Sequence, residues 1–165
     1  MTDERMGDRL WDAIARLPNG AGIVFRHYSL PAEARAAMAA RVAGIAERRE
    51  ITLAVARDGD VAERVGAKLV HNPAVGDPGL PFSVSVHSMK EVNSAKGAAL
   101  AFVSPVFVTS SHPGQVSLGP KRAGEIARAT GVPAIALGGV DAQKFAQLER
   151  EYFYGWAGID AWLRT

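Results

Sequence analysis

Short, continuously apolar runs alternate along this chain with longer stretches that carry the charged residues at helical spacing. The runs are rich in Val, Ile and Ala, and they span residues 22–26, 51–56, 68–71, 82–86, 100–104, 134–137 and 154–157. Because these runs do not alternate with polar positions, both faces of each strand should be buried, as in a parallel sheet covered by helices. The pattern therefore predicts seven strands in an α/β fold.

The segments between these runs are predicted to be helices, and several begin with a start signal. They cover residues 3–17, 31–49, 60–65, 88–96, 119–130 and 141–151. Pro31 suits a first helical turn, and Asp141 is a candidate N-cap. Ser88 precedes Glu91 at the spacing of a capping box. Strands that alternate with helices fit either an open doubly wound sheet or a (β/α)8 barrel that lacks one strand.

Composition favours one compact domain over residues 1–165. Of the 165 residues 48% are hydrophobic, which is enough for one sizeable core. The 19 Lys and Arg are scattered among 17 Asp and Glu, so no nucleic-acid partner is indicated. The lack of cysteine excludes disulfides and thiolate metal sites, and no apolar run is long enough to span a membrane. We expect a cytoplasmic protein that binds no membrane, with a homo-oligomer left open.

Two glycines directly follow the apolar run at 134–137 and are candidates for a phosphate site. Gly138 and Gly139 would let a ligand approach the backbone, and the amides of the next helical turn would face an anion. The same pair also suits a tight turn between strand and helix that needs positive φ. In a barrel the loop after the seventh strand is a recurrent phosphate position, which favours the phosphate interpretation.

Polar side chains also follow other predicted strands. The irregular stretch at 104–118 contains Thr109, Ser111 and His112, which could hold phosphate oxygens or simply form a solvated turn. Arg26 ends the first run, where a guanidinium could bind a phosphate or pair with a carboxylate.

Two further candidates lie on the fourth run. Ser85 and His87 share one face of this predicted strand, but no acid is placed to orient the imidazole. A hydrolase triad is therefore not indicated, and His87 is expected to close the strand or cap the following helix. The four histidines lie in four separate segments, so their spacing predicts no zinc site.

Residues 83–140 resemble the thiamine-phosphate synthase family, which includes a thiazole tautomerase branch. Its motifs "VSxHS", "GPVFxTxSK" and "PxxAIGGI" are matched by VSVHS at 84–88, SPVFVTSSH at 104–112 and PAIALGGV at 133–140. Two further segments of the chain resemble family motifs more weakly. FRHY at 25–28 looks like "LRxK", and GAKLVH at 66–71 looks like "GADGVH". Because order and spacing also agree, the combined match is far more specific than any one motif.

The resemblance implies a (β/α)8 barrel whose first strand is missing or truncated, with residues 1–3 as its tail. It also implies a reaction that joins hydroxymethylpyrimidine diphosphate to a thiazole phosphate, giving thiamine phosphate and pyrophosphate. Such chemistry depends on neutralising the departing diphosphate and holding the second phosphate. Mg²⁺ would be the cofactor and small phosphorylated compounds the substrates. The implied catalytic residues are Arg26 and Ser85, and the implied phosphate-binding residues are Thr109, Ser111, His112, Gly138 and Gly139.

Several family positions carry other residues in this chain. Tyr28 and His112 replace two lysines, and Asp160 replaces a serine of a phosphate-binding turn. The magnesium-binding positions fall on Ala56 and Arg57, beside Asp58, and on Gly76, beside Asp77. Two alternatives to the synthase therefore stay open. One is a non-catalytic barrel that carries or senses thiamine phosphate or a thiazole phosphate. The other is a tautomerase-like isomerase, although Pro105 occupies the position of its catalytic histidine.

Overall fold

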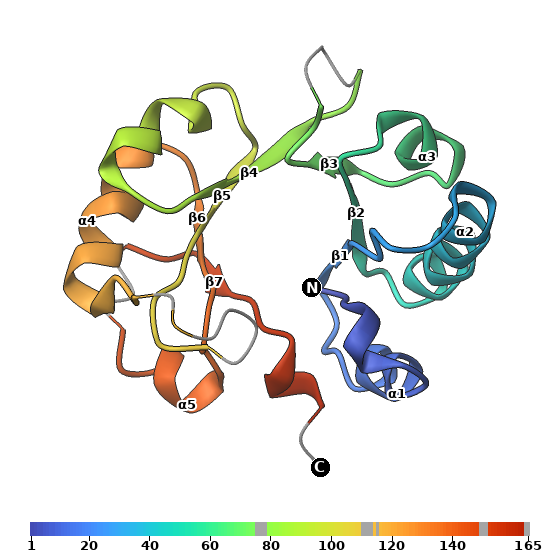
Figure 1. The fold of residues 1–165 in the computed structure, drawn as a ribbon, viewed down its shortest axis with the longest axis horizontal. Helices are drawn as coiled ribbons and strands as arrows, with labels where there is room; N and C mark the ends of the chain where they lie inside the picture. The colour runs from blue at the N-terminus through green and yellow to red at the C-terminus, as the bar shows by residue number, and fades with distance from the viewer. Residues whose placement is uncertain (75–78, 110–113, 115, 149–151, 164–165) are drawn as a thin grey trace. The chain divides into compact units, whose positions relative to one another are not determined.

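The computed structural model describes residues 1–74, 79–109, 114, 116–148 and 152–163. Among these residues strands alternate with helices except that the fourth strand follows the third directly in the element order (Figure 1). The strands are β1 Gly22–Phe25, β2 Thr52–Ala56, β3 Leu69–His71, β4 Phe82–Val86, β5 Leu100–Val103, β6 Ala134–Ala136 and β7 Gly155–Trp156. The α-helices are α1 Arg9–Ala15, α2 Ala32–Arg48, α3 Gly59–Arg64, α4 Gly119–Thr130 and α5 Ala142–Phe145. Three 3₁₀ helices are η1 Glu4–Met6, η2 Met89–Ala95 and η3 Asp160–Trp162.

All seven predicted strands are present, and neighbouring strands pair in parallel in the order of the chain within each of two sets, β1–β2–β3 and β4–β5–β6–β7. The parallel pairing explains why the runs are continuously apolar. In β2, for example, the four residues that follow Thr52 are all buried. The α/β class is therefore confirmed, with seven strands in the described part of the chain.

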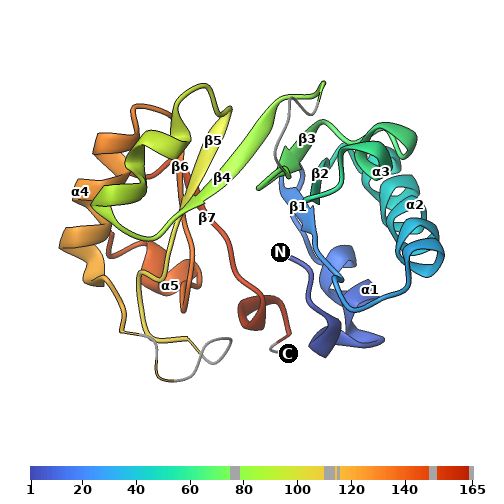
Figure 2. The same cartoon turned by 45° about the horizontal axis from the view of Figure 1, so that its top comes forward.

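The chain divides into two compact units, Met1–Phe82 with Trp162–Thr165, and Ser83–Ala161. In the first unit α2 and α3 pack on the strands β1–β3 (Figure 2). In the second unit α4 packs on β5 and β6, and α5 packs on β7. Each unit has its own fully buried side chains, such as Phe25 and Val55 in the first and Val103 and Ile126 in the second. One domain over residues 1–165 stays a prediction.

The opening segment is not the single helix predicted for residues 3–17. Asp3 accepts a hydrogen bond from the Arg5 N–H and begins η1, and Gly7 ends it with a φ of 50°. This left-handed glycine interrupts the helical path, so α1 begins separately at Arg9. Before η1 the Thr2 N–H donates to Val24 O at 2.9 Å, which places Thr2 alongside β1.

Two other predicted helices also differ in form. The segment predicted at 88–96 is 3₁₀ in character, and Ser88 makes no side-chain cap. Its hydroxyl instead donates to the Glu91 carboxylate at 2.9 Å, and the His87 N–H donates to the same carboxylate at 2.9 Å. Asp141 does cap α5, since its carboxylate accepts from the Lys144 N–H at 2.9 Å. That helix is shorter than predicted because the next N–H groups bond to carbonyls three residues back.

No helix in the described ranges combines the length and the apolar character that crossing a bilayer requires.

Candidate functional site

The backbone is left-handed just beyond the strands of the first unit, at residues that carry side chains. His27, Arg57 and Asn72 follow β1, β2 and β3, and their φ values are 32°, 69° and 46°. A residue other than glycine costs on the order of 1–2 kcal/mol in this conformation. Such strain gathers at functional sites because the surrounding structure has to maintain it. The carboxyl ends of β1–β3 are therefore a candidate functional site.

Arg35, on α2, joins the first two of these strand ends. Its side chain donates from Nε to Arg26 O at 3.3 Å and from one terminal nitrogen to Ala56 O at 2.7 Å. The other terminal nitrogen donates to the Asp58 carboxylate at 3.0 Å. Arg35 is only 8% exposed, and its hydrogen bond to Ala56 O is buried, whereas those to Arg26 O and Asp58 are partly buried. It fixes the turns after β1 and β2 relative to each other.

Two more arginines gather around one aromatic ring, and we call Arg26, Tyr28 and Arg57 the arginine–tyrosine group. The guanidinium carbons of Arg26 and Arg57 lie 5.6 Å and 4.7 Å from the centre of the Tyr28 ring. Both distances are within the range of a cation–π contact. The Arg57 N–H also donates to His71 O at 2.8 Å, which ties the turn after β2 to β3.

A hollow of about 530 Å³ lies beside the arginine–tyrosine group. Its lining includes Tyr28, Arg35, Arg57, Asp58 and Asp60. Such a volume is within the usual range for a pocket that accepts a small molecule. The guanidinium groups can bind phosphate oxygens in a planar, two-pronged geometry.

Buried imidazoles lie near Arg26 and are neutral at physiological pH. His71 is 3% exposed, and burial, followed by the charge of Arg26, lowers its pKa to about 4. His27 is also buried, which lowers its pKa, and its Nδ1 lies 3.0 Å from the hydroxyl oxygen of Thr2. The positive charge at this end of the strands therefore comes from the arginines.

The described residues of the first unit do not suit Mg²⁺, which prefers carboxylate oxygens and water in octahedral geometry. One oxygen of Asp58 accepts from the Val61 N–H at 3.0 Å as the N-cap of α3. The other oxygen accepts from Arg35. In the described ranges no three or more His, Cys, Asp or Glu residues gather as metal ligands would. Gly76 and Asp77 lie outside the described residues.

In the second unit the predicted phosphate turn is packed tightly against a neighbouring segment. Gly138 and Gly139 have φ values of 90° and 62°, so the turn does need positive φ. A Cβ on Gly138 would lie 2.7 Å from Pro105, and one on Gly139 would lie 2.3 Å from Val108 O. The Phe107 N–H donates to Gly138 O at 3.0 Å. Both glycines thus have a packing role, and phosphate binding there stays a prediction.

Lys144 places a positive charge on this turn. Its ammonium group donates to Gly139 O at 2.8 Å and lies 5.4 Å from the centre of the Phe107 ring. An ammonium group has three donors, so this contact leaves capacity for an anion.

The other predicted site residues of the second unit are only partly placed. Ser85 is half-buried on β4 and pairs with Phe102 of β5. Thr109 is half-buried beyond β5, on the segment that meets the two glycines. Ser111 and His112 lie outside the described residues.

A profile of the family described as "Thiamine monophosphate synthase" matches residues 2–161, which is nearly the whole chain. The chain belongs to the thiamine monophosphate synthase family. The resemblance seen in the motifs is thereby confirmed.

Individual members of the thiamine monophosphate synthase family agree with this. A protein of Aquifex aeolicus (strain VF5) described as "Putative thiamine-phosphate synthase 2" is 32% identical over 130 residues. That match covers 72% of this chain and 64% of the relative, so the chain spans less than two thirds of the relative's length.

Solved structures show the fold. The thiamine phosphate pyrophosphorylase from Pyrococcus furiosus superposes with a TM-score of 0.81 at 21% identity, over 96% of this chain and 83% of that one. An HpcH/HpaI aldolase/citrate lyase family protein from Burkholderia cenocepacia J2315 gives 0.61 at 13% identity, over 93% and 85%. The second match is to a protein of another family, so the fold alone does not specify the reaction.

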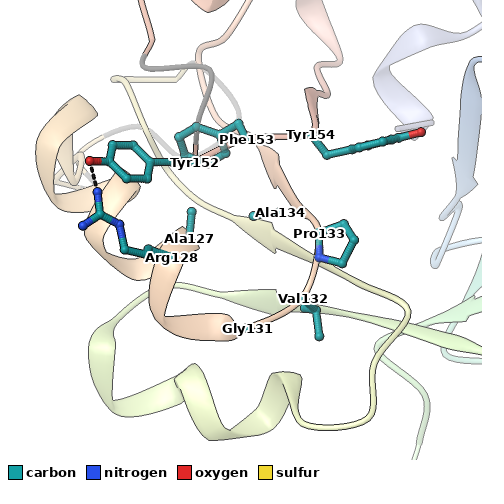
Figure 3. Close-up of a pocket in the computed structure, with 9 residues that line it drawn as sticks. All are labelled: Ala127, Arg128, Gly131, Val132, Pro133, Ala134, Tyr152, Phe153 and Tyr154. Carbon is teal, nitrogen blue, oxygen red and sulfur yellow. Dashed lines mark hydrogen bonds between the residues drawn. The ribbon is translucent and has the colours of Figure 1, made fainter.

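A second hollow, of about 490 Å³, lies in the second unit of this thiamine monophosphate synthase family protein (Figure 3). It is next to Pro133 and Ala134, at the amino end of β6, whereas the glycine turn follows the carboxyl end. Arg128, which lines it, donates to the Tyr152 hydroxyl and lies over the Tyr152 ring at 4.2 Å. None of the predicted site residues that the structure describes lines this hollow.

Sequence reasoning did not predict site roles for Arg35, Arg57 or Lys144. For Arg35 a signal did exist, because it falls in register with Ala39, Val42 and Ala46 on the buried face of α2. Arg57 was noted only as a departure from a magnesium-binding position. Lys144 gave no signal, since a lysine in the first turns of a helix is usually solvated.

Proposed function

We propose that this chain is a thiamine-phosphate synthase, joining hydroxymethylpyrimidine diphosphate to a thiazole phosphate. The observation that carries the proposal is Arg26, which holds its family position at the end of β1 and lies within a cationic group beside a hollow. Membership of the family supports the same conclusion.

The reaction balances without a general base. The bond between the pyrimidine methylene carbon and the diphosphate oxygen breaks, and its electron pair leaves with pyrophosphate. The lone pair of the thiazole nitrogen then forms the new carbon–nitrogen bond. Because no proton is transferred, the protein's task is to stabilise the leaving diphosphate and to position the second substrate.

The proposal assigns different groups to the two substrates. Arg26 stabilises the leaving diphosphate, while Thr109, Ser111, His112, Gly138 and Gly139 hold the phosphate of the thiazole. Lys144 adds a positive charge to that phosphate, and Ser85 offers a hydroxyl to the pyrimidine. The (β/α)8 barrel with a missing or truncated first strand, the magnesium requirement and the cytoplasmic location that the sequence suggested also belong to this proposal.

The test is turnover by the full chain supplied with both phosphorylated precursors, in the presence and absence of MgCl2. Formation of thiamine phosphate, detected by mass spectrometry, is the expected result, and Arg26→Ala should lower the rate at least a hundredfold. Arg48→Ala is a matched control, because Arg48 is exposed in the last turn of α2. No product, or equal rates for both variants, would contradict the proposal.

A second candidate is a protein that binds thiamine phosphate or a thiazole phosphate without turnover. The observation in its favour is that both Asp58 oxygens accept hydrogen bonds within the protein. Tight binding of thiamine phosphate, measured by calorimetry, with no product from the two precursors would favour this carrier over the enzyme.

A further inference from the structure

The turn after β2 carries a positive charge at the place where the family resemblance puts magnesium ligands. Arg57 occupies that turn in a left-handed conformation, with a φ of 69°, and is solvent-exposed. A fixed guanidinium repels a divalent cation and attracts the diphosphate that the cation would otherwise neutralise. The described residues thus favour the anion itself over a metal–anion complex.

The Tyr28 ring gives the two arginines a common support. The guanidinium carbons of Arg57 and Arg26 are 4.7 Å and 5.6 Å from its centre. An arginine that rests on an aromatic ring keeps its planar edge available for oxygen atoms, and it loses less rotational freedom when it binds them. Tyr28 replaces a family lysine, so the ring takes the place of one cation and positions two others.

The acidic side chains of the hollow do not cancel this charge. Asp58 is paired with Arg35 at 3.0 Å, so its charge is already compensated. Asp60 also lines the hollow, in the first turn of α3. Arg35 and Arg57 balance these two carboxylates within the lining. Arg26 lies outside the lining, over the Tyr28 ring, and adds a further positive charge beside the hollow.

We propose that Arg57 and Arg26, supported by Tyr28, form a diphosphate-binding site that needs no divalent cation. The inference rests on the proposed function, because it names how this chain holds the leaving group of that reaction. Arg57 takes over the charge neutralisation that a metal would supply, and it does so as a ligand of the diphosphate oxygens.

The first experiment measures binding of inorganic pyrophosphate to the full chain by calorimetry, once in EDTA and once in excess MgCl2. Binding in EDTA that is at least as tight as binding with Mg²⁺ is the expected result. Binding that appears only when Mg²⁺ is added would overturn the inference.

Variants then locate the site. Arg57→Gln should weaken pyrophosphate binding in EDTA at least tenfold, and Arg57→Lys should weaken it less because it keeps the charge. Arg48→Gln removes the same charge from an exposed position on α2 and should change affinity less than twofold. Circular dichroism confirms that each variant is folded. Equal affinities for Arg57→Gln and Arg48→Gln would overturn the assignment.

The role of the ring has its own pair of variants. Tyr28→Phe keeps the aromatic face and should leave affinity within about twofold, whereas Tyr28→Ala should lower it three- to tenfold. An equal loss of affinity in both variants would show that the hydroxyl matters and the ring does not. No loss in Tyr28→Ala would show that the ring does not position the arginines.

Turnover separates this inference from the proposed function. Pyrophosphate binding in EDTA without turnover would support the site and reject the synthase. Turnover that requires Mg²⁺ and is unchanged in Arg57→Gln would support the synthase and overturn the metal-free site. Turnover in EDTA that Arg57→Gln abolishes would support both.

Discussion

Each of the three guanidinium nitrogens of Arg35 donates a hydrogen bond to a group of its own chain. Within the described part of the chain this distinguishes Arg35 from Arg26 and Arg57. Two of its hydrogen bonds satisfy carbonyl oxygens at the ends of β1 and β2, and the third meets Asp58. Removing such a side chain leaves buried acceptors unsatisfied, which is costlier than the hydrogen bonds are worth when made. Arg35 is therefore a structural residue, placed among residues that are available for binding.

Arg35→Met should lower the free energy of unfolding by about 2–4 kcal/mol, since it keeps the aliphatic stem and removes the donors. Urea unfolding followed by circular dichroism measures this change. Arg64→Met is the control, because Arg64 is exposed on α3 and, among the described residues, its side chain donates only to Asp60 O, at 3.3 Å. The control should change stability by less than about 0.5 kcal/mol. A similar loss in both variants would contradict the structural role of Arg35.

His71 makes the stability of the fold depend on pH in a definite direction. Its folded pKa of about 4 lies below its usual 6.5, first because of burial and then because of Arg26. The unfolded chain therefore binds the proton more readily, so stability is full above pH 6.5 and falls as the pH drops toward 4. The loss over that range is about 3 kcal/mol at most.

His71→Gln should flatten the dependence of unfolding free energy on pH between 6.5 and 4. The measurement is urea unfolding at several pH values in that window, and the slope is compared with that of the unchanged chain. His87→Gln, at an exposed histidine, should keep most of the slope. An unchanged slope in His71→Gln would show that this imidazole is not the group that titrates.

At the scale of elements, the strands were predictable and the helix details were not. A buried parallel strand shows in the sequence as a continuous apolar run, and all seven runs became strands. The break in the opening helix depends on the φ of Gly7, and the 3₁₀ form of η2 depends on where Glu91 places its carboxylate. The spacing of hydrophobic residues predicts neither feature. The contacts of Arg35 were equally hidden, because they exist only once α2 lies on the sheet.

The turn after β6 provides a test of whether glycine is needed there for its conformation or for space. Gly131 and Gly139 have nearly the same φ, 67° and 62°, but a Cβ on Gly131 would meet nothing within 4 Å. Gly131→Ala should therefore cost about 1 kcal/mol, from backbone strain alone. Gly139→Ala should cost at least about 2 kcal/mol more, because its Cβ would run into Val108 O. Equal losses of unfolding free energy in the two variants, measured by thermal or urea unfolding, would mean that the turn and the segment around Val108 separate easily.

For the whole molecule, the two compact units raise the question of whether the chain unfolds as one. Hydrogen exchange of the backbone amides can answer it with the variants above. If the units are energetically separate, Arg35→Met should speed exchange mainly in Met1–Phe82, and Gly139→Ala mainly in Ser83–Ala161. Faster exchange throughout the chain for either variant would show a single cooperative domain, as the composition predicts.

The left-handed residues beyond β1, β2 and β3 also bear on how this protein could be engineered. Replacing Asn72 or Arg57 by glycine would relieve the backbone strain of a positive φ, and a search for stabilising substitutions would therefore select it. At Arg57 the same substitution would remove a guanidinium group that is proposed to bind the diphosphate. Selection for thermal stability alone could thus yield a more stable protein that no longer binds its substrate.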